Sequence, residues 1–477
     1  MKAHPLLLEL DTRCWLRGLS DKLARPVTLA TVPAEVFRSW QERHFTHLWL
    51  MGAWASGPKA RDLARAQPGL RALSQEAFGE RGTEELTGSP YAVADYTVAA
   101  DLGGAAALRQ FRATLRQHGI GLVLDFVPNH LGLDHPWLAE KTDLFVWSLD
   151  QRPDTFAVTA GQGTRWVAHG KDPHFPAWSD TAQLDYRRQE TRSAMIAAWQ
   201  SVAAQCGGAR CDTAMLLLND VFDKTWAHFP ARGPAPAGEF WAGAVAALKR
   251  RHPKFMCIAE AYWDLEPRLC ALGFDYAYDK KFLDYLAARD WPALQKHLRA
   301  AGARFPAARF LQNHDQPPIA SLLSAPEHKA AAVLLLAQPG LRLLHDGQLA
   351  GRRRRTPVQF ARYWPEAPDP EITSFYDRLL SLLPQTAVGR GEMEFCQTGL
   401  PHCFVMKWKA EAARLTLVSV NLAPHPAAFQ LRDLQPGWEI RSLFADPDSA
   451  WSWQDAVLQN DLAPHGFLML ELRRTFL

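Results

Sequence analysis

The segment Gly121-Leu-Val-Leu-Asp-Phe-Val-Pro-Asn-His130 begins as an apolar run and ends in polar side chains. Its first five residues predict a short buried β-strand, with Asp125 at the end of that strand and His130 just beyond it. Three further apolar runs end in the same way. Their polar ends are Arg210-Cys-Asp212, Glu260-Ala-Tyr-Trp263 and Asn313-His-Asp315. Repeated strands with polar ends are typical of a parallel sheet whose strand ends meet at one site.

Eight strands of this kind are expected, and helical patterns separate them. They are predicted at residues 6–10, 47–51, 121–125, 209–212, 255–260, 274–278, 308–312 and 341–344. The helical pattern is clearest at residues 33–43, opened by Pro33 in the first turn, and at residues 105–118, ended by Gly119. Alternation of eight strands with helices predicts an α/β fold of the (β/α)8 TIM barrel type.

Two stretches break this alternation. Residues 131–187 are rich in Trp, His, Pro, Asp and Gly and are too long for an ordinary connection, so we expect a short functional insertion after the third strand. From residue 389 the pattern consists of strands alone, which predicts a C-terminal antiparallel β-sandwich domain at 389–477. Its clearest runs are 404–408, 415–420 and 467–472. Residues 1–130 and 188–388 are then assigned to the catalytic barrel.

The composition gives no support for a nucleic-acid or membrane partner. The chain has 477 residues, 48% of them hydrophobic, and a net charge of only +3. No segment approaches the roughly 20 uninterrupted apolar residues of a membrane span. Seven scattered cysteines without a CxxC pair suit reduced thiols, and the N-terminus lacks a signal segment, so a cytoplasmic location is expected. Eighteen tryptophans leave room for sugar-stacking surfaces besides core packing.

Cleavage of a glycosidic bond with retention of configuration requires a pair of carboxyl groups. The predicted strand ends supply such groups. Arg210 and Asp212 are two residues apart on one strand and face the same side, where the arginine stabilises the carboxylate that a nucleophile needs. Glu260 ends an apolar strand close to another carboxylate, an environment that keeps a carboxyl group protonated for general acid catalysis. Asp315 can clamp sugar hydroxyls. We therefore predict Asp212, Glu260 and Asp315 as catalytic residues.

Other groups at the same strand ends are candidates for substrate binding. The imidazoles of His130 and His314 can bind hydroxyls, and Trp263 can close the wall of a sugar site. A single histidine is more often structural, and an Arg–Asp pair at a strand end is common, so each of these residues also has a purely structural interpretation. The run Arg352-Arg-Arg-Arg355 is interpreted either as a solvated loop or as a pocket wall for an anionic or hydroxyl-rich ligand.

The sequence lacks the motifs of several other kinds of active site. There is no GxSxG segment, no Gly-rich phosphate loop and no HExxH. Four potential metal ligands in the insertion match no zinc spacing. They are His169, Asp172, His174 and Asp180.

In order, spacing and residue type, the four strand-end segments resemble the α-amylase superfamily, glycoside hydrolase family 13, over essentially the whole chain. The resemblance implies that Asp212 is the nucleophile, Glu260 the general acid/base and Asp315 the stabiliser of the transition state. It also implies roles in substrate binding. Tyr91 would stack on the sugar, Asp125 would brace the site, and the sugar at the cleaved position would be held by His130, Arg210 and His314.

Three departures from the family pattern concern substrate and metal. Many members carry Lys-His three and four positions after the nucleophile, whereas this chain has Met215 and Leu216, so the usual endo-amylase grip on the departing glucan is not expected. Asn129 matches a calcium-ligand position, but Gln183 replaces the partner aspartate. We therefore expect no cofactor, calcium being the one candidate. The segment His345-Asp-Gly-Gln-Leu349 resembles a Gly-Gln-Glu segment without its glutamate.

The predicted function is retaining cleavage of α-1,4- or α-1,6-linked gluco-oligosaccharides or small α-glucosides through a covalent glycosyl-enzyme. One alternative is an α-glucosyl or maltosyl transferase of the same superfamily, which differs only in the acceptor that reaches the intermediate. Another is a non-catalytic sugar-binding homologue. The expected partner is an oligosaccharide or α-glucoside, with no nucleic acid and no membrane. Linkage, chain length and oligomeric state leave no signature in the sequence.

Overall fold

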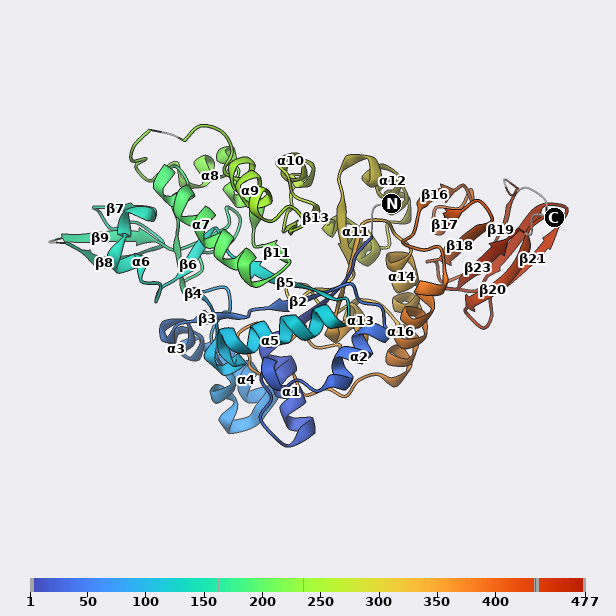
Figure 1. The fold of residues 1–477 in the computed structure, drawn as a ribbon, viewed down its shortest axis with the longest axis horizontal. Coiled ribbons are helices and arrows are strands. Elements are labelled where there is room, and N and C mark those ends of the chain that lie inside the picture. The colour runs from blue at the N-terminus through green and yellow to red at the C-terminus, as the bar shows by residue number, and fades with distance from the viewer. Residues whose placement is uncertain (1–3, 162, 235, 433, 435–436, 475–477) are drawn as a thin grey trace.

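The computed structural model describes residues 4–161, 163–234, 236–432, 434 and 437–474. Eight parallel strands close into a barrel at its centre, in the spatial order β1-β2-β5-β11-β12-β13-β14-β15 (Figure 1). Their bounds are β1 Leu6–Asp11, β2 His47–Met51, β5 Gly121–Phe126, β11 Gly208–Cys211, β12 Met256–Ala259, β13 Tyr276–Tyr278, β14 Ala307–Phe310 and β15 Leu341–His345. Each overlaps a predicted strand, so the predicted TIM barrel is confirmed.

Helices lie around the outside of the barrel, between its successive strands and after the last one. They are α1 Thr12–Leu23, α2 Ala34–Glu42, α3 Pro58–Ala66, α4 Pro68–Phe78, α5 Gly104–Gln117, α7 Gln189–Gln205, α8 Asn219–Trp226, α9 Phe240–Arg251, α10 Glu266–Ala271, α11 Lys280–Ala288, α12 Trp291–Arg304, α13 Ile319–Leu322, α14 Ala325–Leu336, α15 Asp346–Leu349 and α16 Pro370–Leu382. The two helices with the clearest sequence pattern are confirmed as α2 and α5. Pro33 occupies the N-cap of α2 rather than its first turn, since its φ of −62° and ψ of 146° are extended.

The segment between β5 and α7 leaves the barrel and forms small sheets of its own. Its elements are β6 His130–Gly132, α6 Trp137–Glu140, β7 Trp147–Ser148, β8 Thr155–Ala160, β9 Gly163–Ala168 and β10 Thr181–Gln183. Strand β6 pairs antiparallel with β10, which sets His130 opposite Gln183. The insertion is thereby anchored at the carboxyl end of β5. A smaller antiparallel pair, β3 Trp54–Ser56 with β4 Val93–Val98, follows β2.

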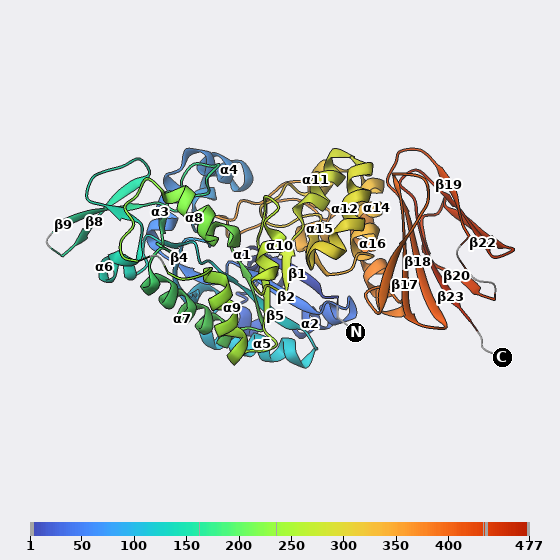
Figure 2. The ribbon, with the colours of Figure 1, turned by 90° about the horizontal axis from the view of Figure 1, so that it is seen from above.

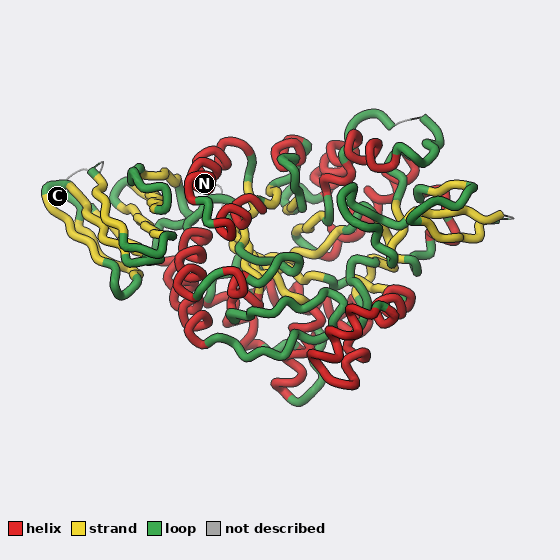
Figure 3. The backbone as a smooth tube through the Cα atoms, turned by 180° about the vertical axis from the view of Figure 1, so that it is seen from behind, coloured by secondary structure: helices red, strands yellow, loops and turns green. Residues whose placement is uncertain are grey.

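The C-terminal region contains only antiparallel strands, which confirms the predicted C-terminal domain. One sheet has the order β16-β17-β18-β23-β20 and the other β19-β22-β21. Their bounds are β16 Glu392–Cys396, β17 Cys403–Glu411, β18 Arg414–Asn421, β19 Ala427–Leu431, β20 Glu439–Ala445, β21 Ala450–Gln454, β22 Val457–Leu462 and β23 Phe467–Arg473. Apolar side chains of both sheets, such as Leu417 and Leu458, share one core. Figure 3 shows the strands of the insertion and those of this domain at opposite ends of the molecule.

Helix α14 joins the barrel to the C-terminal domain. Residues 330–336 of this helix are all buried, because the helix lies between the barrel and β18 (Figure 2). A helix that is apolar on every side requires such burial on both faces. The indole Nε1 of Trp408 on β17 donates to the carbonyl of Ala337 at 2.9 Å and fixes the junction.

The structure also describes the state of the cysteines and the character of the helices, on which the sequence predictions of reduced thiols and of no membrane span depend. All seven cysteines are free thiols, and no disulfide joins any of the described residues. Within the same part of the chain, none of the helices combines the length and apolar character needed to cross a bilayer.

Candidate active site

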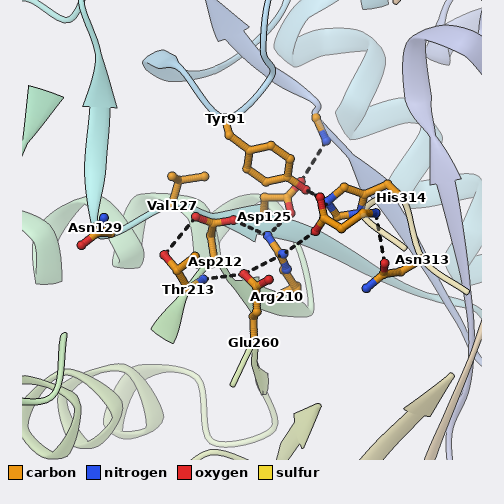
Figure 4. Close-up of polar contacts among 12 residues, drawn as sticks. Tyr91, Asp125, Val127, Asn129, Arg210, Asp212, Thr213, Glu260, Asn313 and His314 are labelled. Atoms are coloured by element: carbon orange, nitrogen blue, oxygen red, sulfur yellow. Dashed lines mark hydrogen bonds and ion pairs between the residues drawn. The ribbon is translucent and has the colours of Figure 1, made fainter. Parts of the chain in front are cut away.

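The four polar segments meet at the carboxyl-terminal rim of the barrel. Parallel strands all end at the same rim, so residues far apart in the chain are brought together there. Asp125 lies on β5 and Arg210 on β11, while Asp212 and Glu260 directly follow β11 and β12. Figure 4 shows these side chains pointing toward one another, with His314 approaching from the loop after β14.

The guanidinium of Arg210 is the centre of this cluster, and the residue is only 1% exposed. Its Nη1 donates to Asp212 Oδ1 at 2.6 Å, and its Nη2 lies 2.8 Å from Glu260 Oε2. Asp125 and Asp315 lie slightly farther away, at 3.7 and 3.8 Å. Burial alone would lower the pKa of Arg210, but the carboxylate of Glu260 and the other negative groups raise it well above its usual value. One buried cation therefore contacts four carboxyl groups.

Glu260 is a buried carboxyl group that accepts two hydrogen bonds and forms an ion pair with Arg210. Besides Arg210, the main-chain N–H of Thr213 donates to its Oε2 at 2.6 Å, and the hydroxyl of Tyr262 donates to its Oε1 at 2.8 Å. Burial raises the pKa of Glu260 to about 7, with Asp212 acting in the same direction and Arg210 against it. A carboxyl group that titrates near neutral pH can both donate and accept a proton.

Thr213 links the two carboxyl groups that the sequence assigns to chemistry. Its hydroxyl lies 3.2 Å from Asp212 Oδ2, while its N–H binds Glu260. A φ of 42° places this residue in the left-handed region, which a β-branched residue adopts only under constraint from its surroundings. The strained turn fixes the separation and orientation of Asp212 and Glu260.

A second chain of contacts holds His314 and Asp315. The Nδ1 of His314 lies 2.5 Å from Oε1 of Glu9, and its Nε2 lies 3.1 Å from Asp315 Oδ2 and 2.8 Å from the hydroxyl of Tyr91. Burial would lower the pKa of His314, but Asp315 and Glu9 raise it well above its usual value. The two flanking carboxylates therefore favour the imidazolium form of the ring, which can donate from both nitrogens.

Asp315 is the most accessible of these acids, since its carboxylate remains 43% exposed. Desolvation works against ionisation here, but His314 and then Arg210 lower the pKa of Asp315 to about 2. These neighbours favour the anionic form of Asp315, whose side chain is partly exposed at the rim of the barrel.

Asp125 lies beneath the cluster. The N–H of Gly52 donates to its Oδ2 at 2.8 Å, and Trp54 Nε1 donates to its main-chain carbonyl at 2.7 Å. Burial raises the pKa of Asp125 to about 6. Such contacts to β2 and β3 suit the bracing role that the family resemblance implies.

Tyr91, His130 and Trp263 surround the acids. The Tyr91 ring is stacked on His314 with centroids 5.3 Å apart. His130 is buried against Trp178 at 4.9 Å, and burial lowers the pKa of His130, which keeps the ring neutral. Trp263 lies farther out: its φ is 64°, its side chain is 40% exposed, and its ring meets the edge of His174 from the insertion at 5.0 Å. An exposed, fixed indole at this position can stack on a sugar.

Several groups of the cluster were not identified from the sequence. Glu9, Gly52, Thr213 and Tyr262 all contact predicted site residues. A charged residue in the middle of the apolar strand Leu6–Asp11 is the one signal that could have revealed Glu9. Thr213 and Tyr262 act through position, directly beside predicted acids, and carry no motif.

The two positions after the nucleophile that depart from the family pattern are part of the core. Met215 and Leu216 lie in the 3-10 helix Ala214–Leu217 and are 1% and 3% exposed. Neither side chain reaches a position from which it could hold a departing glucan.

The residues at the candidate calcium position do not fit this ion. Calcium requires several oxygen ligands, whereas the side-chain amide of Gln183 presents a donor. Its Nε2 donates to the main-chain oxygen of Asn129 at 2.9 Å, to Asn129 Oδ1 at 3.1 Å and to the carbonyl of Leu184 at 3.1 Å. One amide nitrogen thus satisfies three oxygens. Among the described residues, no group of three or more His, Cys, Asp or Glu side chains is arranged to hold a metal.

A protein-family model, curated relatives and solved structures all match this chain, and their names all refer to proteins that act on α-glucans or related sugars. A protein-family model described as "Alpha amylase, catalytic domain" matches residues 83–356. Two curated relatives are alpha-1,4-glucan:maltose-1-phosphate maltosyltransferases, one from Burkholderia pseudomallei with 28% identity over 43% of the chain, the other from Pseudomonas aeruginosa with 25% identity over 40%. The matches span only 17% and 25% of the length of these relatives. A noncanonic maltogenic alpha-amylase from Thermotoga neapolitana shares the fold, with a TM-score of 0.71, 18% identity and 99% coverage of both chains.

Proposed function

The chain belongs to the α-amylase family, and we propose that it is a glycosidase or transglycosidase. We propose that it cleaves α-1,4- or α-1,6-linked gluco-oligosaccharides or small α-glucosides with retention of configuration. The observation that carries this proposal is the contact of the Arg210 guanidinium with Asp212, Glu260, Asp125 and Asp315. This contact supports the proposal, because it holds the proposed nucleophile, acid/base and stabilising anion within reach of one guanidinium, as reaction at a single sugar ring requires.

In the first step, Asp212 attacks the anomeric carbon while Glu260 protonates the glycosidic oxygen. The bond between that carbon and the leaving oxygen breaks, and an ester between the sugar and Asp212 forms. The hydrogen bonds from Arg210 and Thr213 keep Asp212 Oδ1 and Oδ2 in fixed positions before attack. The anionic Asp315 stabilises the positive charge that develops on the ring and binds its hydroxyls.

In the second step, the Glu260 carboxylate removes a proton from an incoming hydroxyl group. The oxygen of that group attacks the anomeric carbon from the face that the leaving group vacated, and Asp212 is released. Water as acceptor gives hydrolysis, and a sugar hydroxyl gives transfer. Transfer is the second candidate function, because both curated relatives are named as maltosyltransferases.

A mechanism-based probe tests the proposal directly. A fluorinated α-glucosyl fluoride that slows the second step should add one fluoroglucosyl group to the intact protein, and peptide mapping should locate it on Asp212. The Asp212→Asn variant should stay unlabelled. Turnover with inversion, or a label on another residue, would overturn the assignment. Binding of glucosides without any label or turnover would favour the non-catalytic, sugar-binding alternative.

Incubation with a single maltooligosaccharide distinguishes hydrolysis from transfer. Products longer than the starting sugar require a sugar acceptor, whereas only shorter products require water. The anomeric proton signals of the first products report retention in the same experiment. We further propose a cytoplasmic location, because seven free thiols suit a reducing compartment, and we propose that neither nucleic acid nor membrane is a partner.

A further inference from the structure

A cleft lies at the end of the barrel opposite to the acidic cluster. This base cleft has a volume of about 350 Å³, and residues at the starts of barrel strands contribute to its lining. Leu6 begins β1, residues 44–46 directly precede β2, and Arg342 is the second residue of β15. The predicted catalytic acids lie at the other end of the barrel, roughly 15 Å away for strands of about five residues. A molecule in the base cleft is therefore out of reach of those acids.

The polar side chains of the base cleft are basic or neutral. None of the residues that line it, all of which belong to the described part of the chain, is an acid. Those with charged or hydrogen-bonding side chains are Gln41, His44, Thr46, His118, Arg342 and Arg390. Nδ1 of His118 lies 2.7 Å from Oε1 of Gln41, and this contact leaves the amide nitrogen of Gln41 as a further donor. The base cleft thus offers donors and positive charge.

Arg342 is a buried cation in the wall of this cleft, with only 6% of the residue exposed. Its Nη1 donates to the carbonyl of Leu336 at 3.0 Å, and its Nη2 donates to the carbonyl of His4 at 2.7 Å. A guanidinium has five N–H donors, and the one on Nε has no acceptor among the described residues. Over the same ranges, no carboxylate oxygen lies within 4.0 Å of this guanidinium. Burial lowers the pKa of Arg342 to about 10, with Tyr276 acting in the opposite direction. Because a buried charge without a counter-ion is costly, an anion in the cleft would stabilise this residue.

Gly389 shows that this guanidinium lies at the wall of the cleft. Gly389 itself lines the cleft, and a Cβ atom at this position would lie 3.1 Å from Nη2 and 3.2 Å from Nη1 of Arg342. The next residue, Arg390, is exposed, and among the described residues no carboxylate oxygen comes within 4.0 Å of its guanidinium. Burial and the charge of Arg390 both lower the pKa of His44, so these two side chains are close to one another. A second guanidinium without an acidic partner therefore borders the same cleft.

We propose that the base cleft is a second ligand site, separate from the proposed active site, for a small organic anion with a phosphate or carboxylate group. The planar donor forks of Arg342 and Arg390 match either kind of oxyanion. The volume of about 350 Å³ is at the lower end of the range for small-molecule sites, about 300–1,000 Å³, which suits a molecule of monosaccharide size. Residues 383–390 lead from α16 toward β16. An anion that contacts both this segment and Arg342 ties the C-terminal domain to the barrel and stabilises the folded chain.

Calorimetric titration at constant ionic strength tests this site. The probes are glucose 6-phosphate, glucuronate, inorganic phosphate and neutral glucose. We expect at least one of the two sugar anions to bind at one site per chain, and glucose to bind much more weakly than that anion. Comparison of the two sugar anions identifies the preferred group, and comparison with inorganic phosphate reports how much the sugar contributes. The bound anion should also raise the melting temperature of the protein.

Variants at the exposed edge of the cleft test the assignment, because Arg342 also supports the fold through its two carbonyl contacts. Arg390→Gln and Gln41→Glu each remove one unit of positive charge from the cleft. Each should weaken binding of the sugar anion by about 3- to 10-fold, and the double variant by about 10- to 100-fold. Arg109→Gln is the matched control. Arg109 is an exposed arginine of α5 that does not line the cleft, and its replacement changes the net charge by the same amount.

Three results would overturn the proposal. Neither sugar anion binds, or glucose binds as tightly as both anions, or Arg390→Gln and Gln41→Glu weaken binding no more than Arg109→Gln does. Each of these results leaves the proposed α-glucoside activity intact, because all the variants keep the residues of the acidic cluster. Turnover of a neutral α-glucoside by the same variants, measured without added anion, should equal that of the wild type.

Discussion

Replacement of Glu9 by glutamine tests whether a residue on the first strand sets the charge state of His314, which follows the seventh barrel strand. Glu9 is fully buried, and its Oε1 lies 2.5 Å from Nδ1 of His314, 305 residues away in the chain. The other ring nitrogen of His314 contacts Asp315. Glu9→Gln keeps the shape and one hydrogen-bonding oxygen but removes the charge that favours the imidazolium.

The expected loss follows from the hydrogen bond that changes character. A buried hydrogen bond to a charged group contributes about 1.5–3 kcal/mol, and each 1.36 kcal/mol corresponds to a factor of ten. If that energy holds His314 against Asp315 in the transition state, kcat/KM should fall by about 10- to 150-fold. Because Glu9 and Asp315 raise the pKa of His314, removal of the Glu9 charge should lower it. Activity that depends on the imidazolium should then be lost at a lower pH on the alkaline side.

The assay is a pH profile of kcat/KM on a neutral α-glucoside, with the ring nitrogen signals of isotope-labelled histidine as an independent readout. Asp11→Asn is the graded control, since Asp11 is a buried carboxyl group on the same strand that makes no hydrogen bond to His314 and acts on it only by charge. It should shift the His314 signals less than Glu9→Gln does. A Glu9→Gln enzyme that folds normally, with an unaltered alkaline limb and an unaltered His314 signal, would refute the role assigned to Glu9.

Three further outcomes follow from the site. Burial raises the pKa of Glu260 to about 7, and the acid form is the one that protonates the leaving oxygen, so kcat/KM should decline as pH rises through about 7. The Glu260→Gln variant should lack this decline. It should lose much less activity on α-glucosyl fluoride, whose leaving group needs little protonation, than on a glucan. Asp212→Asn should lower kcat by at least about a thousandfold, as expected for loss of a nucleophile, with an unchanged circular dichroism spectrum; near-normal rates would remove Asp212 from its role. Chelation of divalent ions should not change the melting temperature of the wild type. The Gln183→Asp variant presents oxygen ligands next to Asn129, so its melting temperature should become dependent on calcium. A wild-type melting temperature that drops on chelation would contradict the conclusion that the Gln183 amide excludes calcium.

The sequence was sufficient to predict the barrel and the common location of the predicted acids, because one rule relates the order of strands in the chain to their arrangement in space. Every strand of a parallel barrel ends at the same rim, so a polar residue at a predicted strand end has a predicted neighbourhood. The positions of Asp125, Arg210 and Glu260 follow from this rule. It does not apply to Glu9, whose partner His314 is set by the closure between the first and last strands of the barrel.

Other features depend on side-chain direction, which no sequence pattern reports. Because Gln183 stands where the family pattern has an aspartate, the sequence led us to expect no calcium. Only the geometry assigns the amide nitrogen of Gln183 to the three oxygens of Asn129 and Leu184. The arginine run left two interpretations open. The contact of Arg355 with Asp315 and the pairing of Arg354 with Glu76 distinguish its members, which are identical in sequence terms.

The division of labour among the acids is a consequence of their neighbours rather than of their residue type. Glu260 and Asp315 both contact Arg210, yet the pKa of the first is raised to about 7 and that of the second is lowered to about 2. Burial dominates at Glu260, and its one cation is shared with other carboxylates. Asp315 is more exposed and contacts the ring of His314 in addition to Arg210. The contact of Glu9 with the same ring favours its charged form. Pairs of titratable groups pushed in opposite directions mark acid/base assignments. Exchange of the two roles would therefore require moving the imidazolium, and no single exchange of Asp for Glu at these positions would achieve it.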